Sequence, residues 1–190
     1  MEQIIKTKRL REALVFLLFI SIVVPFVSCS NHVNLSRLEQ LTKEALKEGS
    51  AESALLYSSR AIEQAETEAE RSSAYALHGF ANYIHSDYSK AFEAFRTSNT
   101  HERNEDASAG IILGAFGKKD YAYVIDHRSL VETLSGEWRF ILGGTSLNQT
   151  VLFETVSLSA CIKGNRGVYD DIKQHLDNNT REKMEAFFFD

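Results

Sequence analysis

The side chains able to bind a metal or to transfer protons are six histidines and several paired acids, and their spacing supports neither chemistry. His78 and His85 are seven residues apart, whereas metal sites on helices use spacings of three or four together with further ligands. Asp170 and Asp171 have no neighbouring partner that would form a hydrolase or phosphate site. The sequence contains neither a glycine-rich phosphate loop nor a Gly-x-Ser-x-Gly motif. We therefore expect no enzymatic activity, no cofactor and no metal site.

The two cysteines occupy different settings. Cys29 follows an apolar run, at a point where export processing would use it. Cys161 lies in an apolar stretch with helical spacing, and an unpaired thiol in such a place is most often a small core residue. The two could pair in principle, but we expect Cys29 to be processed and Cys161 to remain an unpaired thiol in the core.

The elements before Cys29 are typical of an export signal. A basic stretch that ends at Arg11 precedes a nearly unbroken apolar run at 13–27, about the length of a signal-peptide core. A membrane-spanning helix needs about 20 apolar residues, and Pro25 would end a helix late in this run. We therefore favour a cleaved signal, with an uncleaved membrane anchor as the alternative.

The end of the apolar run resembles the lipobox of bacterial lipoprotein signal peptides. It reads Phe26-Val27-Ser28-Cys29 and departs from the family at Phe26, where leucine is usual. The resemblance implies cleavage before Cys29, lipidation of its thiol, and attachment to the cell membrane or outer membrane on the periplasmic or surface-facing side. Several acyl chains give durable attachment where one would be marginal. Ser30 stands where aspartate retains enterobacterial lipoproteins in the inner membrane, which favours the outer membrane. An ordinary signal peptide with a chance cysteine is the alternative.

Composition favours one helical domain after the signal. The chain of 190 residues is 44% hydrophobic and 25% charged, which is ordinary for a globular protein, and has one proline, a residue that helix interiors exclude. Residues 1–28 contain four cations and two anions, so the remainder carries 17 basic against 24 acidic side chains, a formal charge of −7. No basic cluster follows residue 11, and nucleic acid is not an expected partner. The expected divisions are a signal peptide at 1–28, a short tether at 29–34 and a helical domain at 35–190.

Helix starts are marked by capping pairs, in which Ser, Thr or Asn precedes Glu by three residues. Three such pairs begin at Ser36, Thr67 and Asn179, and Asp87 is a further expected cap. Glycines mark the expected helix ends, and 101–106 is expected as a solvated turn. No strand is expected, because the best candidate, 151–153, continues with helical spacing. The expected helices span 36–47, 51–66, 67–85, 88–98, 105–116, 121–134, 147–163, 168–176 and 179–190.

One segment resembles the tetratricopeptide repeat, a pair of antiparallel helices that stacks on its neighbours. Its residues are Tyr75, Gly79, Tyr88, Ala91 and Phe95, at the offsets where the family has an aromatic, a glycine, an acid-tyrosine turn, an alanine and an aromatic. Gly79 and Ala91 would let two helices approach closely, while Tyr75 and Phe95 would fill the space beside them. The segment departs from the family at positions 78 and 82, where leucine and tyrosine are usual.

Weaker copies of this pattern flank the central one. Residues 38–61 repeat it at an offset of 37, and another copy begins near Asp106 with its turn at 117–121. The predicted fold class is therefore all-α, with antiparallel helical hairpins stacked as a short tetratricopeptide-like solenoid. Another kind of helical-hairpin solenoid is the alternative. A last hairpin at 147–176 and a C-terminal helix would cap the stack, because a terminal repeat must cover an exposed apolar face.

The function that these resemblances imply is binding. We expect a lipid-anchored envelope protein, attached to the membrane through Cys29, that holds a protein partner as an interaction module or an accessory subunit of an envelope complex. Asn82, Tyr83, Asn99 and Arg103 are the residues expected on the partner-binding concave face. The alternative is an accessory lipoprotein that carries a small or apolar ligand to a membrane transporter. For the aromatics outside the repeat pattern we favour a core or capping role; they are Trp138 and the phenylalanines at 187–189.

Overall fold

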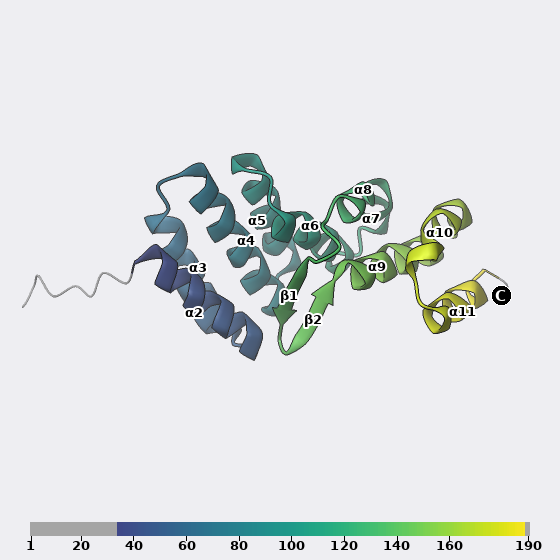
Figure 1. The fold of residues 1–190 in the computed structure, drawn as a ribbon, viewed down its shortest axis with the longest axis horizontal. Coiled ribbons are helices and arrows are strands. Elements are labelled where there is room, and N and C mark those ends of the chain that lie inside the picture. Colours follow the sequence, from purple (N-terminus) through teal and green to yellow (C-terminus); the bar gives the residue numbers. More distant parts are fainter. Residues whose placement is uncertain (1–33, 189–190) are drawn as a thin grey trace, which may run out of the picture. The chain divides into compact units, whose positions relative to one another are not determined.

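The computed structural model describes residues 34–188, which form ten α-helices, one 3₁₀-helix and a two-stranded sheet (Figure 1). The export segment, Cys29 and Phe189 lie outside the described residues. The elements are α2 (Leu35–Glu48), α3 (Ala51–Gln64), α4 (Glu68–Ile84), α5 (Tyr88–His101), α6 (Glu105–Gly117), α7 (Tyr121–Asp126), α8 (Ser129–Glu132), β1 (Arg139–Leu142), β2 (Thr145–Asn148), α9 (Gln149–Ile162), α10 (Arg166–Ile172), η1 (Lys173–His175) and α11 (Asn178–Ala186).

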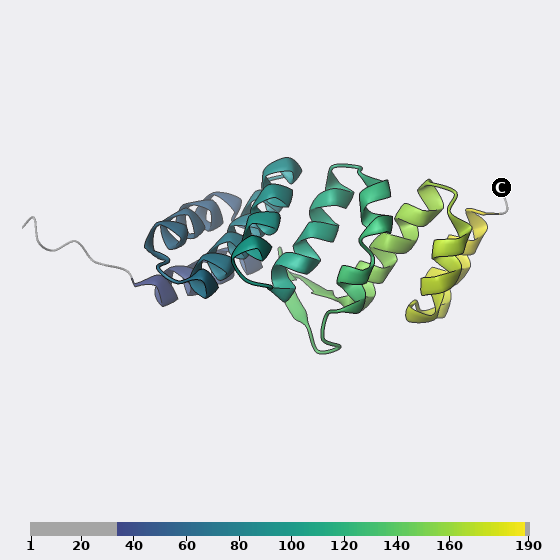
Figure 2. The same cartoon turned by 90° about the horizontal axis from the view of Figure 1, so that it is seen from above.

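Consecutive helices pair in antiparallel fashion, and the pairs stack side by side (Figures 1 and 2). The pairs are α2 with α3, α4 with α5, α6 with α7, and α9 with α10. Each pair contacts the next, through α3 on α4, α5 on α6, and both α6 and α7 on α9, while α11 packs on α9. The prediction of an all-α stack of antiparallel helical hairpins is confirmed.

The four hairpin turns share one backbone geometry. Each begins with a residue of positive φ just after the first helix: Gly49 at 76°, Ser86 at 64°, Lys119 at 63° and Gly164 at 63°. The next residue donates its N–H to the carbonyl five positions earlier, at 2.8 to 3.0 Å, which is the Schellman arrangement that ends helices. From Gly49 to Ser86 is 37 residues, from Ser86 to Lys119 is 33, and from Lys119 to Gly164 is 45. The same turn geometry therefore recurs in the four hairpins, at unequal spacings along the chain.

Side chains that follow these turns start the second helix of three pairs. Asp87 accepts a hydrogen bond from the N–H of Lys90, as predicted, and Asp120 and Asn165 do the same for the amides three residues after them. The predicted capping box of Thr67 with Glu70 is also confirmed, since Thr67 accepts from the Glu70 amide while the Glu70 carboxylate accepts from the Thr67 amide. These caps occupy amides that the helix itself leaves without partners.

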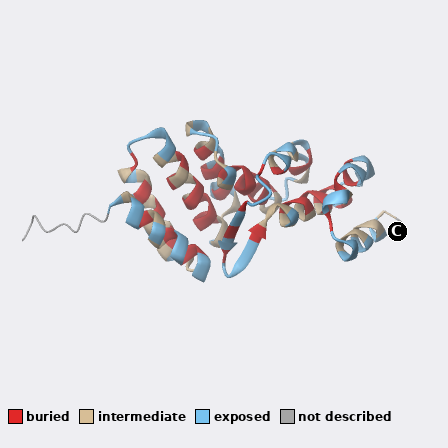
Figure 3. Ribbon diagram, in the orientation of Figure 1, coloured by how far each residue is buried: buried red, intermediate tan, exposed pale blue. Residues whose placement is uncertain are grey.

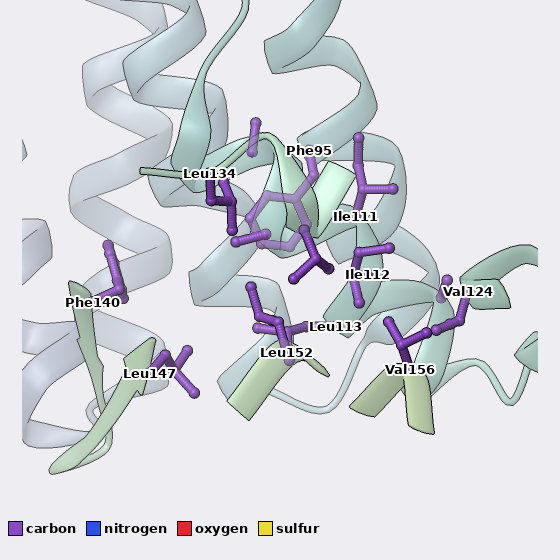
Figure 4. Close-up of a cluster of buried hydrophobic side chains, with 14 of the residues drawn as sticks. Phe95, Ile111, Ile112, Leu113, Val124, Leu134, Phe140, Leu147, Leu152 and Val156 are labelled. Carbon is purple, nitrogen blue, oxygen red and sulfur yellow. The ribbon is translucent and has the colours of Figure 1, made fainter. Parts of the chain in front are cut away.

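The core is continuous through the stack, and Phe95 packs closely within it. Its ring is fully buried between two helices, α4 and α6, at Gly79 and Gly110. A Cβ atom at either glycine would lie less than 3.0 Å from three carbons of the ring. Figure 4 shows Phe95 within the cluster of buried side chains that α5, α6 and α9 contribute. Helix α6 is buried along nearly its whole length, from Ala107 to Ala115, because it has neighbours on several sides (Figure 3).

The prediction that the chain has no strand is wrong. Strands β1 and β2 form an antiparallel hairpin in which Phe140 faces Leu147 and Leu142 faces Thr145. Gly143 and Gly144 form its two-residue turn with φ values of 55° and 77°, and two consecutive positive φ angles are what a tight hairpin turn requires. Alternation of exposed and buried residues along β1 then places Phe140 and Leu142 in the core.

Several predicted helix boundaries are also corrected. The first helix is capped by Asn34 and the last by Asp177, because each side chain accepts from the amide three residues later, in place of the predicted Ser36 and Asn179. The predicted helix at 121–134 is split into α7 and α8, and the one at 147–163 begins only after Asn148, the last residue of β2. The predicted helix at 168–176 begins at Arg166 and ends as the 3₁₀-helix η1.

Candidate functional site

The β-hairpin lies against the first helices of the successive pairs. Its turn caps the C-terminus of α2, because Gly143 and Gly144 donate their N–H groups to the carbonyls of Leu46 and Lys47, both at 2.8 Å. Farther along β1, the ring of Phe140 stacks on that of Phe80 in α4 at 3.9 Å between centroids. Phe140 and its cross-strand partner Leu147 belong to the central cluster (Figure 4). The chain itself therefore covers part of the face formed by α2, α4 and α6.

The segment before β1 is attached to the start of α6. The indole N–H of Trp138 donates to Asp106 at 2.9 Å, and the Ser135 amide donates to Glu105 at 2.7 Å. Trp138 is 5% exposed, which confirms the core role that we favoured for it. Burial raises the pKa of the Asp106 carboxyl, although the hydrogen bond from Trp138 acts in the opposite direction. The stretch 101–106, expected as a solvated turn, thus ends in a partly buried acid with a fixed partner.

A cleft of 310 Å³ opens between α2, the start of α6 and strand β1. Asp106 lies at one wall, and the strand contributes Arg139, Phe140 and Ile141. The remaining wall consists of Lys43 and Lys47, which are four residues apart and therefore on one exposed face of α2.

The charge of this cleft is opposite to that of the chain. Three cations line it, Lys43, Lys47 and Arg139, while the chain as a whole has a formal charge of −5. Within residues 34–188 none of the three forms a salt bridge, and Arg139 donates to the carbonyls of Gly136 and Trp138. We refer to the six residues Lys43, Lys47, Asp106, Arg139, Phe140 and Ile141 as the cationic cleft.

A second hollow, of 510 Å³, lies between the turn after α4 and the turn after α6. Its lining includes His85, Asp87 and Lys118. The carboxylate of Asp87 is occupied by the Lys90 amide and ammonium groups, at 3.2 and 2.8 Å. The ammonium group of Lys118 lies over the ring of Phe92. The two charged side chains with stated partners, Asp87 and Lys118, are thus engaged within the chain, and we take the cationic cleft as the better candidate for a site.

The residues of the repeat resemblance meet where two helix pairs join. Gly79, Ala91 and Phe95 are buried, with Gly79 directly against the Phe95 ring. Tyr75 is half-buried and stacks on His101, with ring centroids 5.5 Å apart. Tyr88 lies so close to Gly117 of α6 that a Cβ atom there would overlap its ring. All five take part in packing between helices.

The four residues expected on a partner-binding face do not lie together. Asn82 is 4% exposed and donates to the His78 carbonyl at 2.9 Å, so its side chain lies inside the helix pair. Tyr83, also near the turn after α4, packs its ring edge on Tyr88. Asn99 and Arg103 lie at the opposite end of the same antiparallel pair. The structure therefore does not bring these four residues into one surface.

Asn99 has a structural partner of its own. Its carboxamide accepts from the Asn104 amide at 3.1 Å and faces Ser108 at 3.4 Å, and it thereby holds the turn between α5 and α6. Arg103 in that turn is exposed. Neither residue borders the cationic cleft.

Four of the five histidines within residues 34–188 pack on other rings or bond to neighbours, whereas His85 lines the hollow of 510 Å³. His127 stacks on Tyr123 at 3.7 Å and His175 on Phe153 at 4.1 Å. His78 contacts the Ser58 hydroxyl at 3.0 Å, and burial lowers its pKa. Within residues 34–188 no three His, Cys, Asp or Glu side chains converge as ligands for a metal ion. Cys161 is a free and buried thiol, as expected.

Sequence reasoning missed the cationic cleft. Lys43 and Lys47 were visible as two lysines four residues apart on the polar face of a predicted helix, a pattern that usually marks a solvated surface. Arg139 lies more than 90 residues later, in a segment that was not recognised as a strand. Only the folded chain places the three cations around one opening.

No helix among residues 34–188 has the length and apolar character needed to cross a membrane. A scan against protein-family models finds no match to the chain, and a search of curated proteins finds none either.

Proposed function

We propose that this chain is a lipid-anchored protein of the bacterial cell envelope, whose tetratricopeptide-like stack of helical hairpins acts as a protein interaction module. The observation that carries the proposal is the cationic cleft, an open site with three cations that have no salt-bridge partner within residues 34–188. A charged opening of this kind suits recognition of another molecule, because charge complementarity steers and orients a partner. The chain provides binding, on this proposal, and no catalysis.

Support for the anchor comes from the sequence. The segment Phe26-Val27-Ser28-Cys29 resembles a lipobox, and a basic stretch and an apolar run precede it in the order of an export signal. Lipid on Cys29 would attach the hairpin stack to a membrane through the short tether at 29–34, with its surface in the envelope space. A tethered module meets membrane-bound partners at a higher effective concentration than a free one does.

The anchor is tested by intact-mass measurement on protein extracted with detergent from a bacterial envelope. We expect a chain that begins at Cys29 and carries acyl groups. Cys29→Ala removes the acyl mass and the cleavage, whereas the matched Cys161→Ala variant retains both, because Cys161 is buried in the hairpin stack. An uncleaved chain without acyl groups in the wild type contradicts the anchor.

The interaction is tested by photo-crosslinking in the same cells. A photoreactive amino acid replaces Ile141, which lines the cationic cleft, or Ile162, which is 47% exposed at the end of α9 outside the cleft. We expect a defined protein adduct from position 141, identified by mass spectrometry, that is missing from position 162. An absence of protein adducts from both positions contradicts the proposed function.

A further inference from the structure

The cationic cleft has a second feature beside its charge, the free edge of strand β1. Every residue that the sheet contributes to the cleft comes from β1, and α2 contacts β1 while α9 contacts β2. The outer edge of β1 therefore borders the cleft. Because Leu142 and Thr145 flank a two-residue turn, they form the hydrogen-bonded pair next to it, and the following pair, Ile141 with Ser146, points its N–H and C=O groups outward.

These outward groups are available on the cleft side. Within residues 34–188 the backbone of Ile141 makes no hydrogen bond to a loop, cap or side chain. Its side chain is 44% exposed and lines the opening together with Arg139. An unpaired strand edge with an exposed apolar side chain is a template on which another extended chain adds as a strand.

We infer that the cationic cleft binds an acidic, extended peptide segment of a partner protein, which adds to the edge of β1 and places its carboxylates near Lys43, Lys47 and Arg139. This inference rests on the proposed function and specifies its partner. Backbone hydrogen bonds to Ile141 provide strand pairing that is independent of sequence. The three cations select acidic side chains, and Ile141 contacts an apolar residue between them.

The geometry favours a peptide over the headgroups of an anionic membrane. The charges line a concave opening that is bordered by a helix and a strand, which a single extended chain can enter and a flat bilayer surface cannot. Asp106 lies in the same opening and adds an acceptor for the backbone N–H groups of a peptide. The outward C=O of Ile141 needs an N–H donor, which a peptide backbone supplies and a phosphate oxygen does not.

The test is fluorescence anisotropy with the full chain in detergent micelles. The probe is a fluorescein-labelled octapeptide of alternating glutamate and valine, and its control is the same peptide with lysine for glutamate. We expect binding of the acidic peptide only, with an affinity that falls as salt is raised, because exposed charge pairs are screened. The double variant Lys43→Glu/Lys47→Glu is expected to weaken binding by about tenfold or more, by reversing two of the three charges.

Two matched controls separate the site from general effects. Lys163→Glu/Lys183→Glu makes the same change in net charge at exposed positions outside the cleft and is expected to leave binding unchanged. Ile141→Pro removes the outward N–H of β1 and is expected to weaken binding by at least about fivefold, the equivalent of one lost hydrogen bond. Ser146→Pro removes the corresponding N–H on β2, away from the cleft, and is expected to have no effect. Circular dichroism and melting temperature confirm that each variant is folded.

Four results would overturn the inference. Equal affinity for the acidic and basic peptides would show that the cations of the cleft do not select the ligand. Equal loss of affinity in Lys43→Glu/Lys47→Glu and Lys163→Glu/Lys183→Glu would show that the cleft is not the binding site. Equal effects of Ile141→Pro and Ser146→Pro on peptide binding would show that the edge of β1 does not bind the peptide. Binding of labelled phosphatidylglycerol in the micelles that depends on Lys43 and Lys47, without peptide binding, assigns the site to lipid. A protein adduct from a photoreactive residue at 141, together with any of these, would leave the proposed interaction function standing but would reject an acidic strand as the bound segment.

Discussion

The contact of Phe95 with two glycines makes a quantitative prediction for Gly110→Ala. In an exposed helix this change would stabilise the chain by about 1 kcal/mol, because alanine has the higher helix propensity. Here the added methyl group would lie less than 3.0 Å from three carbons of the Phe95 ring. The ring is fully buried, meets Gly79 on another helix and forms an edge-to-face pair with Phe80 at 4.9 Å between centroids, so neighbours on several sides oppose its displacement.

Overpacking of a filled core costs about 1–3 kcal/mol, and the constraint on the ring from two helices places this site near the upper limit. After subtraction of the propensity gain, we expect a net loss of about 2 kcal/mol in the free energy of unfolding. For a domain of this size that corresponds to a fall of about 4–8 °C in melting temperature. Urea denaturation and thermal melting of the full chain in detergent measure the two quantities.

A control and a double-mutant cycle test the cause. Gly136→Ala adds a methyl group where no described atom lies within 4 Å, so its unfolding free energy is expected to stay within about 0.5 kcal/mol of the wild type. Phe95→Leu shortens the side chain that Gly110→Ala would strike, so the double variant is expected to be more stable than the sum of the single effects by about 1 kcal/mol or more. An unchanged or raised stability of Gly110→Ala, or additivity in the cycle, would refute the reasoning.

Two further predictions concern the turns and the buried histidine. Ser86 and Lys119 have a Cβ atom and a positive φ angle, so Ser86→Gly and Lys119→Gly should each raise the unfolding free energy by about 0.5–1 kcal/mol. Gly49→Ala in the equivalent turn should lower it. Urea denaturation distinguishes the two signs. Burial, and secondarily the charge of Lys90, lowers the pKa of His78 in the folded chain. The unfolded chain therefore takes up this proton first as the pH falls, and the folded state loses stability as the pH falls below about 6.5, the ordinary pKa of histidine. His78→Gln is expected to remove this part of the pH dependence. Denaturation curves of the wild type and the variant at three pH values in that range measure it, and an equal change of unfolding free energy with pH in both proteins would refute the reasoning.

Local signals predicted those parts of the fold that depend on near neighbours in the chain. Thr67 with Glu70 and Asp87 before Tyr88 identified two helix starts, because a cap depends on a side chain and an amide only three residues away. The same rule failed at Ser36 and Asn179, where Asn34 and Asp177 lie two residues upstream and form the caps instead. Several residues in one short segment can act as a cap, and the sequence pattern does not rank them.

The β-hairpin shows a different limit. Its turn signal was present as Gly143-Gly144, but the residues before it do not alternate apolar with polar types, because Ile141 between Phe140 and Leu142 is apolar. Four residues per strand are too few to outweigh the helical spacing of the surrounding segments. The hairpin is stable because Phe140 stacks on Phe80 and the turn amides bond to the end of α2, which are contacts with distant segments.

The sequence by itself determined the helical character of the chain, the pairing of its helices through short turns, and the packing residues around Gly79, Ala91 and Phe95. These depend on propensities and spacings within one or two helices, so that neighbouring residues are sufficient to specify them. The placement of Lys43 and Lys47 opposite Arg139 depended on the tertiary structure alone. It requires that a hairpin formed late in the chain return to the end of α2, and the contacts that drive this return join residues about 60 to 100 positions apart, which no local pattern encodes.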